Sequence, residues 1–155
     1  MWIWSKRILL ALIVFFVVSQ IIRPSRANPP IDPRSDIHAA LAIDPKVASI
    51  LARSCNDCHS NRTVWPWYSQ VAPASWLVAY DVRHGRRKLN FSEWNARSDE
   101  GNQKILKDIC SEVSQGEMPG WAYSLLHPDA RVSQVDVQAV CDWSRGQATA
   151  FLHLD

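Results

Sequence analysis

The chain has 155 residues, and residues 28–155 are enough for one domain with a single core but not for two. The formal net charge is +2, from 17 basic and 15 acidic residues. Lys6, Arg7, Arg23 and Arg26 lie in an apolar N-terminal segment, and without these four the chain has 13 basic and 15 acidic residues. This balance excludes the basic surface that nucleic-acid binding requires.

The first predicted element is the N-terminal segment, in which Lys6 and Arg7 precede an apolar stretch over 8–22. This order is typical of an export signal. Fifteen residues of helix reach about 22 Å, less than the ~30 Å hydrocarbon core, and Ser25 to Ala27 offer small residues for cleavage. Apolar residues before Lys6 and a snorkelling Arg23 favour a retained membrane anchor instead. We interpret residues 1–27 as a signal peptide or anchor, and we favour the anchor.

The next segments predict a spacer followed by helices. Residues 28–43 contain Asn28-Pro29-Pro30 and Pro33, which indicate a stiff, extended spacer. Asp44-Pro45 is an N-cap with a first-turn proline, and the apolar spacing after it predicts a helix that continues into residues 55–59. A loop over 61–68 and a helix from Pro73 to about Gly85 follow.

Two more helices complete the predicted domain, which covers residues 44–155. One runs from about Ser98 to Gln115 with Gly116 as its C-cap, and the last begins at the capping pair Ser133 and Asp136. No segment alternates as a strand would, so the sequence predicts an all-α fold.

The most informative motif is Cys55-Asn56-Asp57-Cys58-His59, a CxxCH sequence. Positions i, i+3 and i+4 share a helix face, so both thiols and the imidazole point the same way. The thiols can then bond to the two vinyl groups of one haem while His59 ligates the iron. The motif predicts one covalently attached haem c, with Cys55, Cys58 and His59 as cofactor-binding residues.

Two other kinds of site use the same residue types. A thioredoxin-like redox dithiol requires a sequence pattern of alternating strands and helices, which this sequence lacks. A zinc site would want a second ligand pair, and Cys110 and Cys141 stand alone in the sequence. These two cysteines are either a disulfide between helices or two small buried side chains.

The second iron ligand is predicted to be Met118, in Gly116-Glu117-Met118-Pro119-Gly120. Glycine and proline stiffen this loop, and His/Met ligation is typical of electron-carrying cytochromes. Four histidines compete with it, of which the one nearest in sequence is the strongest rival: His127, His84, His38 and His153.

Further side chains have predicted roles outside the ligand set. Four tryptophans either wall the haem or fill the core: Trp65, Trp67, Trp76 and Trp94. A basic run has three possible roles: to pair with the haem propionates, to bind an acidic partner, or to form a solvated helix end. Its residues are Arg83, Arg86, Arg87 and Lys88.

Several longer motifs accompany CxxCH, in a fixed order along the chain. They are Cys55 to Asn61, Trp65-Pro66-Trp67-Tyr68, Ala72-Pro73-Ala74-Ser75-Trp76, Leu89-Asn90-Phe91-Ser92-Glu93-Trp94, Gly116-Glu117-Met118-Pro119 and Leu126-His127-Pro128. Together they resemble the bacterial haem-binding domain family of small, often membrane-anchored monohaem c-type cytochromes. The resemblance implies a cytochrome c-like helical fold, with Cys55 and Cys58 as attachment points and His59 and Met118 as the metal ligands.

The sequence therefore predicts an exported monohaem cytochrome that transfers single electrons between redox partner proteins, and not an enzyme, because two protein ligands leave no open iron position. Its predicted location is the periplasmic side of the bacterial inner membrane, held there by residues 1–27, or the periplasm if those residues are removed. The chief alternative is a haem enzyme or sensor in which peroxide or a gas displaces Met118.

Overall fold

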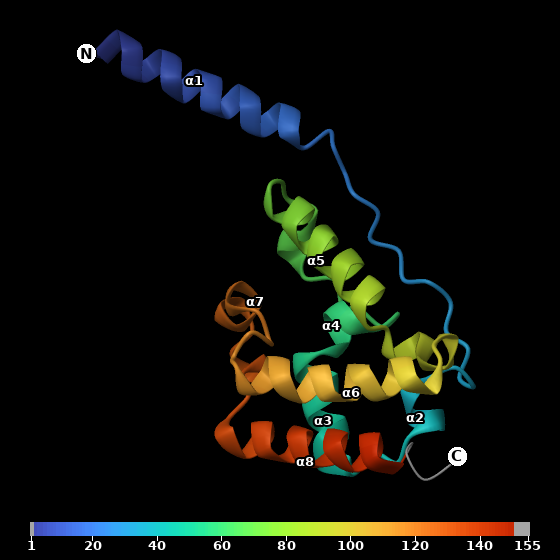
Figure 1. Ribbon diagram of the computed structural model, residues 1–155. Coiled ribbons are helices and arrows are strands. Elements are labelled where there is room, and N and C mark those ends of the chain that lie inside the picture. The colour runs from blue at the N-terminus through green and yellow to red at the C-terminus, as the bar shows by residue number, and fades with distance from the viewer. Residues whose placement is uncertain (1, 151–155) are drawn as a thin grey trace.

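The computed structural model describes residues 2–150, which fold into helices joined by turns and irregular segments, so the all-α prediction is confirmed. Figure 1 shows the arrangement, with α6 and α8 packed side by side and α5 rising from them. The helices are α1 (Trp2–Ser19), α2 (Ile37–Ala40), α3 (Pro45–Ser54), α4 (Asn56–His59), α5 (Ala74–Lys88), α6 (Asp99–Ser114), α7 (Trp121–Leu126) and α8 (Gln134–Ala150), with the short 3₁₀ helices η1 (Trp67–Gln70), η2 (Phe91–Ala96) and η3 (Pro128–Ala130).

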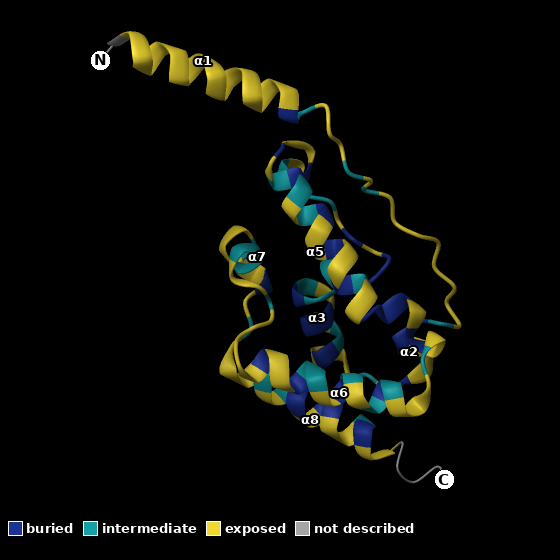
Figure 2. Cartoon of the chain, turned by 45° about the horizontal axis from the view of Figure 1, so that its top comes forward, coloured by how far each residue is buried: buried dark blue, intermediate teal, exposed yellow. Residues whose placement is uncertain are grey.

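Helix α1 lies apart from the other helices, and its apolar side chains are exposed along its length (Figures 1 and 2). The predicted membrane-spanning anchor is not found. Among the residues that the structure describes, none of the helices combines the length and the apolar character that crossing a membrane requires. The 18 residues of α1 rise about 27 Å, short of a ~30 Å hydrocarbon core, and they include Lys6 and Arg7.

The segment after α1 is bonded to the domain rather than held away from it. The Gln20 amide exchanges two hydrogen bonds with the backbone of Ala72, at 3.3 and 3.0 Å. The Trp76 indole donates to the Ile22 carbonyl at 2.9 Å. Further bonds join Arg26 to Ser69, Asn28 to Thr63, and Pro30 to Asn61.

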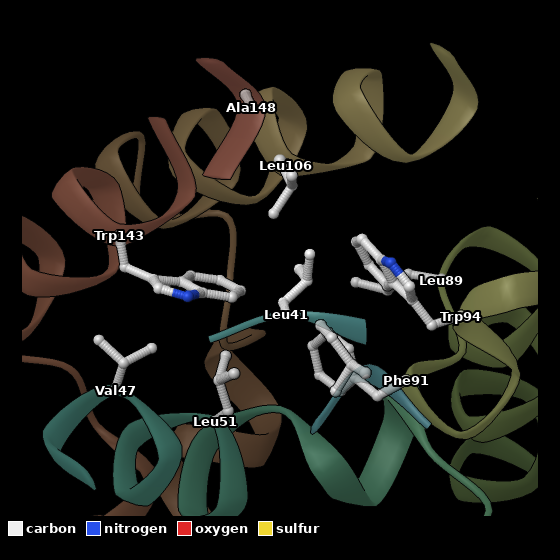
Figure 3. Close-up of a cluster of buried hydrophobic side chains, with 10 residues drawn as sticks. Leu41, Val47, Leu51, Leu89, Phe91, Trp94, Leu106, Trp143 and Ala148 are labelled. Atoms are coloured by element: carbon white, nitrogen blue, oxygen red, sulfur yellow. The ribbon is translucent and has the colours of Figure 1, made fainter. Parts of the chain in front are cut away.

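The main core lies where α3, α6 and α8 meet the segment that carries η2. Asp44 caps α3 through the N–H groups of Lys46 and Val47, as predicted, and this cap starts the helix that buries Val47 and Leu51. Figure 3 shows the side chains that converge there from these elements. The buried members are Ile37, Leu41, Val47, Leu51, Leu89, Phe91, Trp94, Leu106, Trp143 and Ala148.

A disulfide joins α6 to α8, which decides between the two alternatives for Cys110 and Cys141. It lies in a second buried cluster with Ile50, Val113 and Val140. The predicted caps of these two helices are confirmed. Helix α6 ends at Ser114, and Gly116 follows with a φ of 74°, the conformation of a glycine that terminates a helix. Ser133 and Asp136 form a capping box before α8, in which Asp136 N donates to Ser133 Oγ at 3.2 Å and Ser133 N donates to Asp136 Oδ2 at 2.9 Å.

Helix α5 is longer than predicted, because it continues past Gly85 to Lys88. Gly85 is therefore a packing residue and not a helix end. A Cβ at this position would lie 2.5 Å from the backbone oxygen of Cys58, closer than real Cβ contacts come. The absence of a side chain thus lets α5 pack directly on the backbone of α4.

This contact predicts that Gly85→Ala destabilises the fold by about 1–3 kcal/mol, because the added methyl meets backbone that cannot rotate away. The matched control is Gly146→Ala in α8, where an added Cβ meets nothing within 4 Å and should stabilise the helix by about 0.5–1 kcal/mol. Urea unfolding followed by circular dichroism measures both. Equal effects of the two substitutions would contradict the account.

Candidate functional site

The CxxCH motif forms one turn at the junction of α3 and α4. The predicted single helix is interrupted at Cys55, whose φ and ψ are −125° and −38°, so this residue ends α3 and begins α4. The backbone bonds still run through the junction, because the Cys55 carbonyl accepts from the N–H of His59 at 2.9 Å and of Cys58 at 3.2 Å. The two cysteines and the histidine therefore stay within one helical turn.

Both thiols of this turn are free, and both residues are half-buried. Burial, assisted by the neighbouring Cys58, raises the pKa of Cys55 to about 12. Burial also raises the pKa of Cys58 to about 11, assisted by the negative charges of Asp81 and Asp57. Both groups are therefore protonated at neutral pH. A catalytic CxxC dithiol needs the opposite shift, so the redox-dithiol alternative does not fit this turn.

The His59 ring is held by the backbone that follows α5. Its Nδ1 lies 3.1 Å from the Leu89 carbonyl oxygen, which can only accept, so Nδ1 carries the proton and donates. Nε2 is then the nitrogen with a lone pair. Burial lowers the pKa of His59, so the ring is neutral at pH 7. A neutral imidazole oriented through its other nitrogen is the form that binds a metal.

Arg86 fixes the loop that leaves the motif. Its guanidinium donates to the Ser60 carbonyl at 2.9 Å, to Thr63 Oγ1 at 2.8 Å and to Asn28 Oδ1 at 2.7 Å. Thr63 in turn donates to the Asp57 carbonyl at 2.6 Å. Arg86 is thus a structural donor to this loop, a role different from the propionate or partner contact that the sequence suggested for the basic run.

A second set of contacts joins the motif to α7. The Tyr123 hydroxyl donates to Asp57 Oδ2 at 2.7 Å, and its ring stacks on His127 with centroids 4.3 Å apart. His127 Nε2 lies 2.7 Å from the Tyr68 hydroxyl. His127, the predicted rival of Met118, is therefore engaged by two tyrosines. His153, another rival, lies outside the described residues.

Met118 lies in the turn between α6 and α7, and 41% of its surface is exposed. Its backbone N–H donates to the Glu112 carbonyl at 3.2 Å, so the turn folds back on the end of α6. The charge of Glu112 raises the pKa of His59 against the larger effect of burial, which places this end of α6 within electrostatic reach of the ring. The thioether is thus carried by a turn at the end of α6.

Large apolar side chains are exposed on the segments around the motif. On α5, Leu77 and Tyr80 lie on the same side as Asp81 and His84, whose charges influence Cys58 and His59. On η1 and α7 the exposed apolar residues are Trp67, Trp121, Leu125 and Leu126. Protonated thiols, a neutral imidazole, a thioether and this apolar cover are the groups that an apolar iron macrocycle requires, so the residues present fit a haem.

The same residues do not fit zinc. Cys110 and Cys141 are joined to each other and cannot complete a second ligand pair. Within residues 2–150 there is no group of three or more histidine, cysteine or acidic side chains arranged to hold a metal ion.

Of the four tryptophans predicted to wall the haem or fill the core, Trp94 is a fully buried member of the main core.

Three features of the site were not found from the sequence: the Tyr123 contact of Asp57, the donors of Arg86 and the Leu89 carbonyl. Asp57 stands at a variable position of CxxCH, and Arg86 stands in a run typical of a solvated helix end. A backbone carbonyl has no signal in a sequence at all.

A family model described as a haem-binding domain matches residues 14–146, which include Cys55, Cys58, His59 and Met118. No curated protein and no solved structure matches the chain.

The link to α7 predicts that Tyr123→Phe lowers the free energy of unfolding by about 1.5 kcal/mol, because Asp57 loses a charge-assisted hydrogen bond. Tyr80→Phe is the control, since Tyr80 is exposed and its contact is ring stacking on His84, which phenylalanine keeps. Chemical unfolding of the two variants measures the difference. If Tyr80→Phe costs as much, the Tyr123 hydroxyl does not tie α7 to the motif.

Proposed function

The chain belongs to the haem-binding domain family, and from this premise we propose that it is an exported c-type cytochrome that carries single electrons on one covalently bound haem. The observation that carries the proposal is the turn from Cys55 to His59. This turn holds two protonated thiols and a neutral, oriented imidazole within five residues. The bound group would supply a one-electron iron couple, and the protein supplies its attachment and its ligands.

The two thiols are suited to covalent attachment. Each would form a thioether with one vinyl group, in which sulfur bonds to one vinyl carbon and the thiol hydrogen goes to the other, so no oxidant is needed. The attachment requires reduced cysteines, and Cys55 and Cys58 are free although Cys110 and Cys141 are paired. The site thus keeps its thiols available in a chain that does form a disulfide.

His59 and Met118 are the proposed metal ligands. The Leu89 carbonyl holds the His59 ring and raises the basicity of its Nε2, which strengthens it as a ligand. Met118 supplies a soft sulfur that favours ferrous iron. Two protein ligands leave no open position, so electron transfer and not substrate chemistry is the proposed activity.

Two observations support export to an oxidising compartment, which we propose is the periplasm. The first is the sequence of Lys6 and Arg7 before the apolar residues of α1. The second is the disulfide between Cys110 and Cys141, because disulfides persist outside the cytoplasm. The proposed partners are redox proteins of that compartment that donate or accept one electron.

A haem enzyme or sensor is the second candidate, and the exposure of Met118 favours it. A ligand side chain that is 41% exposed on a turn is more easily displaced than a buried one. Displacement by peroxide or a gas would open the iron position and change the activity class.

Attachment is tested with cysteine variants expressed in a bacterium that makes c-type cytochromes. Cys55→Ala/Cys58→Ala should lose all haem stain on a denaturing gel, because no thioether forms. Cys110→Ala/Cys141→Ala is the control with the same number of cysteines removed, and it should keep the full stain. Retained stain in the first variant would refute the attachment points.

The distal ligand is tested by Met118→Ala and Met118→His. The alanine variant should give a high-spin or water-ligated iron that binds carbon monoxide within mixing time, because the sixth position is open. The histidine variant should stay low-spin with a lower midpoint potential, since imidazole is the better donor to ferric iron. A wild-type spectrum in Met118→Ala would show that Met118 is not a ligand, and His127→Ala would then be the variant to compare.

A further inference from the structure

A cavity of about 540 Å³ lies beside α5. Its walls come from α5, from η2 with the residue after it, from the loop that follows the motif, and from segment 25–29 after α1. The charged and aromatic side chains around it are Arg83, Arg86, Arg87, Arg97, Glu93 and Trp65.

The charges around this cavity are unbalanced. Four guanidinium groups face one carboxylate, and none of the four is in an ion pair among residues 2–150. The one carboxylate, Glu93, accepts instead from the Asn61 amide at 3.2 Å. Like charges gathered at a cavity repel each other unless an anion balances them, and guanidinium groups pair with carboxylate and phosphate through two parallel hydrogen bonds.

The same residues have unused hydrogen-bond donors. Arg83 makes no side-chain hydrogen bond within the described part of the chain, and Arg97 makes one, to the Lys88 carbonyl at 3.1 Å. The Trp65 indole N–H is buried without an acceptor, which is costly unless a bound group supplies one. Arg86 differs from these, because the loop after the motif already takes its donors.

The cavity and the CxxCH turn lie on different faces of α5. Ala79, Val82, Arg83 and Arg86 line the cavity and share one face through their i, i+3, i+4 and i+7 spacing. Gly85, which packs on Cys58, has the spacing of the other face together with Asp81 and His84. Most of the cavity-lining side chains of α5 therefore lie on another face than the one that packs on Cys58, which favours an anion from solution as the occupant.

We propose that this cavity is a binding site for a small oxyanion, a phosphate or carboxylate compound, held by Arg83 and Arg97. Arg86 forms the fixed wall of the site, and segment 25–29 closes it on the side of α1. Nothing in this site takes part in ligating iron, so it stands apart from the proposed electron transfer.

The test is calorimetric titration of the full-length, haem-loaded protein with inorganic phosphate and, separately, with citrate at constant ionic strength. Saturable binding of either probe at one site is expected, and the tighter probe identifies phosphate or carboxylate as the preferred chemistry. Arg83→Gln/Arg97→Gln should weaken that binding at least about tenfold, because two charge-assisted contacts are lost. The control is Arg145→Gln on α8, which removes the same charge at an exposed position outside the cavity and should change the affinity less than twofold.

If the double variant does not fold, Arg83→Gln alone still tests the site, because Arg83 makes no side-chain hydrogen bond within residues 2–150. This single variant should weaken binding several-fold. No saturable binding of either probe to the wild-type protein would overturn the proposal. Equal affinities of Arg83→Gln and Arg145→Gln would overturn it as well.

Discussion

The close packing of α5 on α4 is the contact on which the rest of the site depends. With no side chain at Gly85, α5 approaches the backbone of Cys58 and carries two further groups to the motif: the Leu89 carbonyl, which orients His59, and the Arg86 guanidinium, which holds Ser60. Any side chain at Gly85 would push this whole set outward. One glycine thus connects the packing of two helices with the tautomer of a proposed iron ligand.

The motif is tied on its other side to α7. Asp57, between the two cysteines, accepts from Tyr123, while Thr63 and Arg86 hold the loop that follows. The disulfide and the buried residues of α6 and α8 form a separate base below these contacts. The exposed apolar side chains of α5 and α7 lie around the motif, and a bound macrocycle would remove them from water.

Much of this fold is predictable from the sequence, because caps and apolar spacing are local signals. Asp44, Ser133 and Gly116 act as predicted. Gly85 does not end its helix as predicted, because a glycine is needed there for close packing on Cys58, a residue distant in the sequence. Residues 1–27 were predicted to be a signal peptide or an anchor, and none of the helices within residues 2–150 is long and apolar enough to cross a membrane. The four candidate cofactor-binding residues were identified from residue type and order. Their supporting groups, a carbonyl, an aspartate and an arginine, depend on tertiary contacts that no local pattern encodes.

The central claim is that this chain holds one haem with His59 and Met118 as its two iron ligands. The most direct measurement is the absorption spectrum of the purified full-length protein, oxidised and reduced, with and without carbon monoxide. We predict a low-spin, six-coordinate spectrum in both states, a weak far-red sulfur-to-iron band in the oxidised state, and no rapid change on adding carbon monoxide. A high-spin spectrum without that band, which changes at once with carbon monoxide, would contradict the claim.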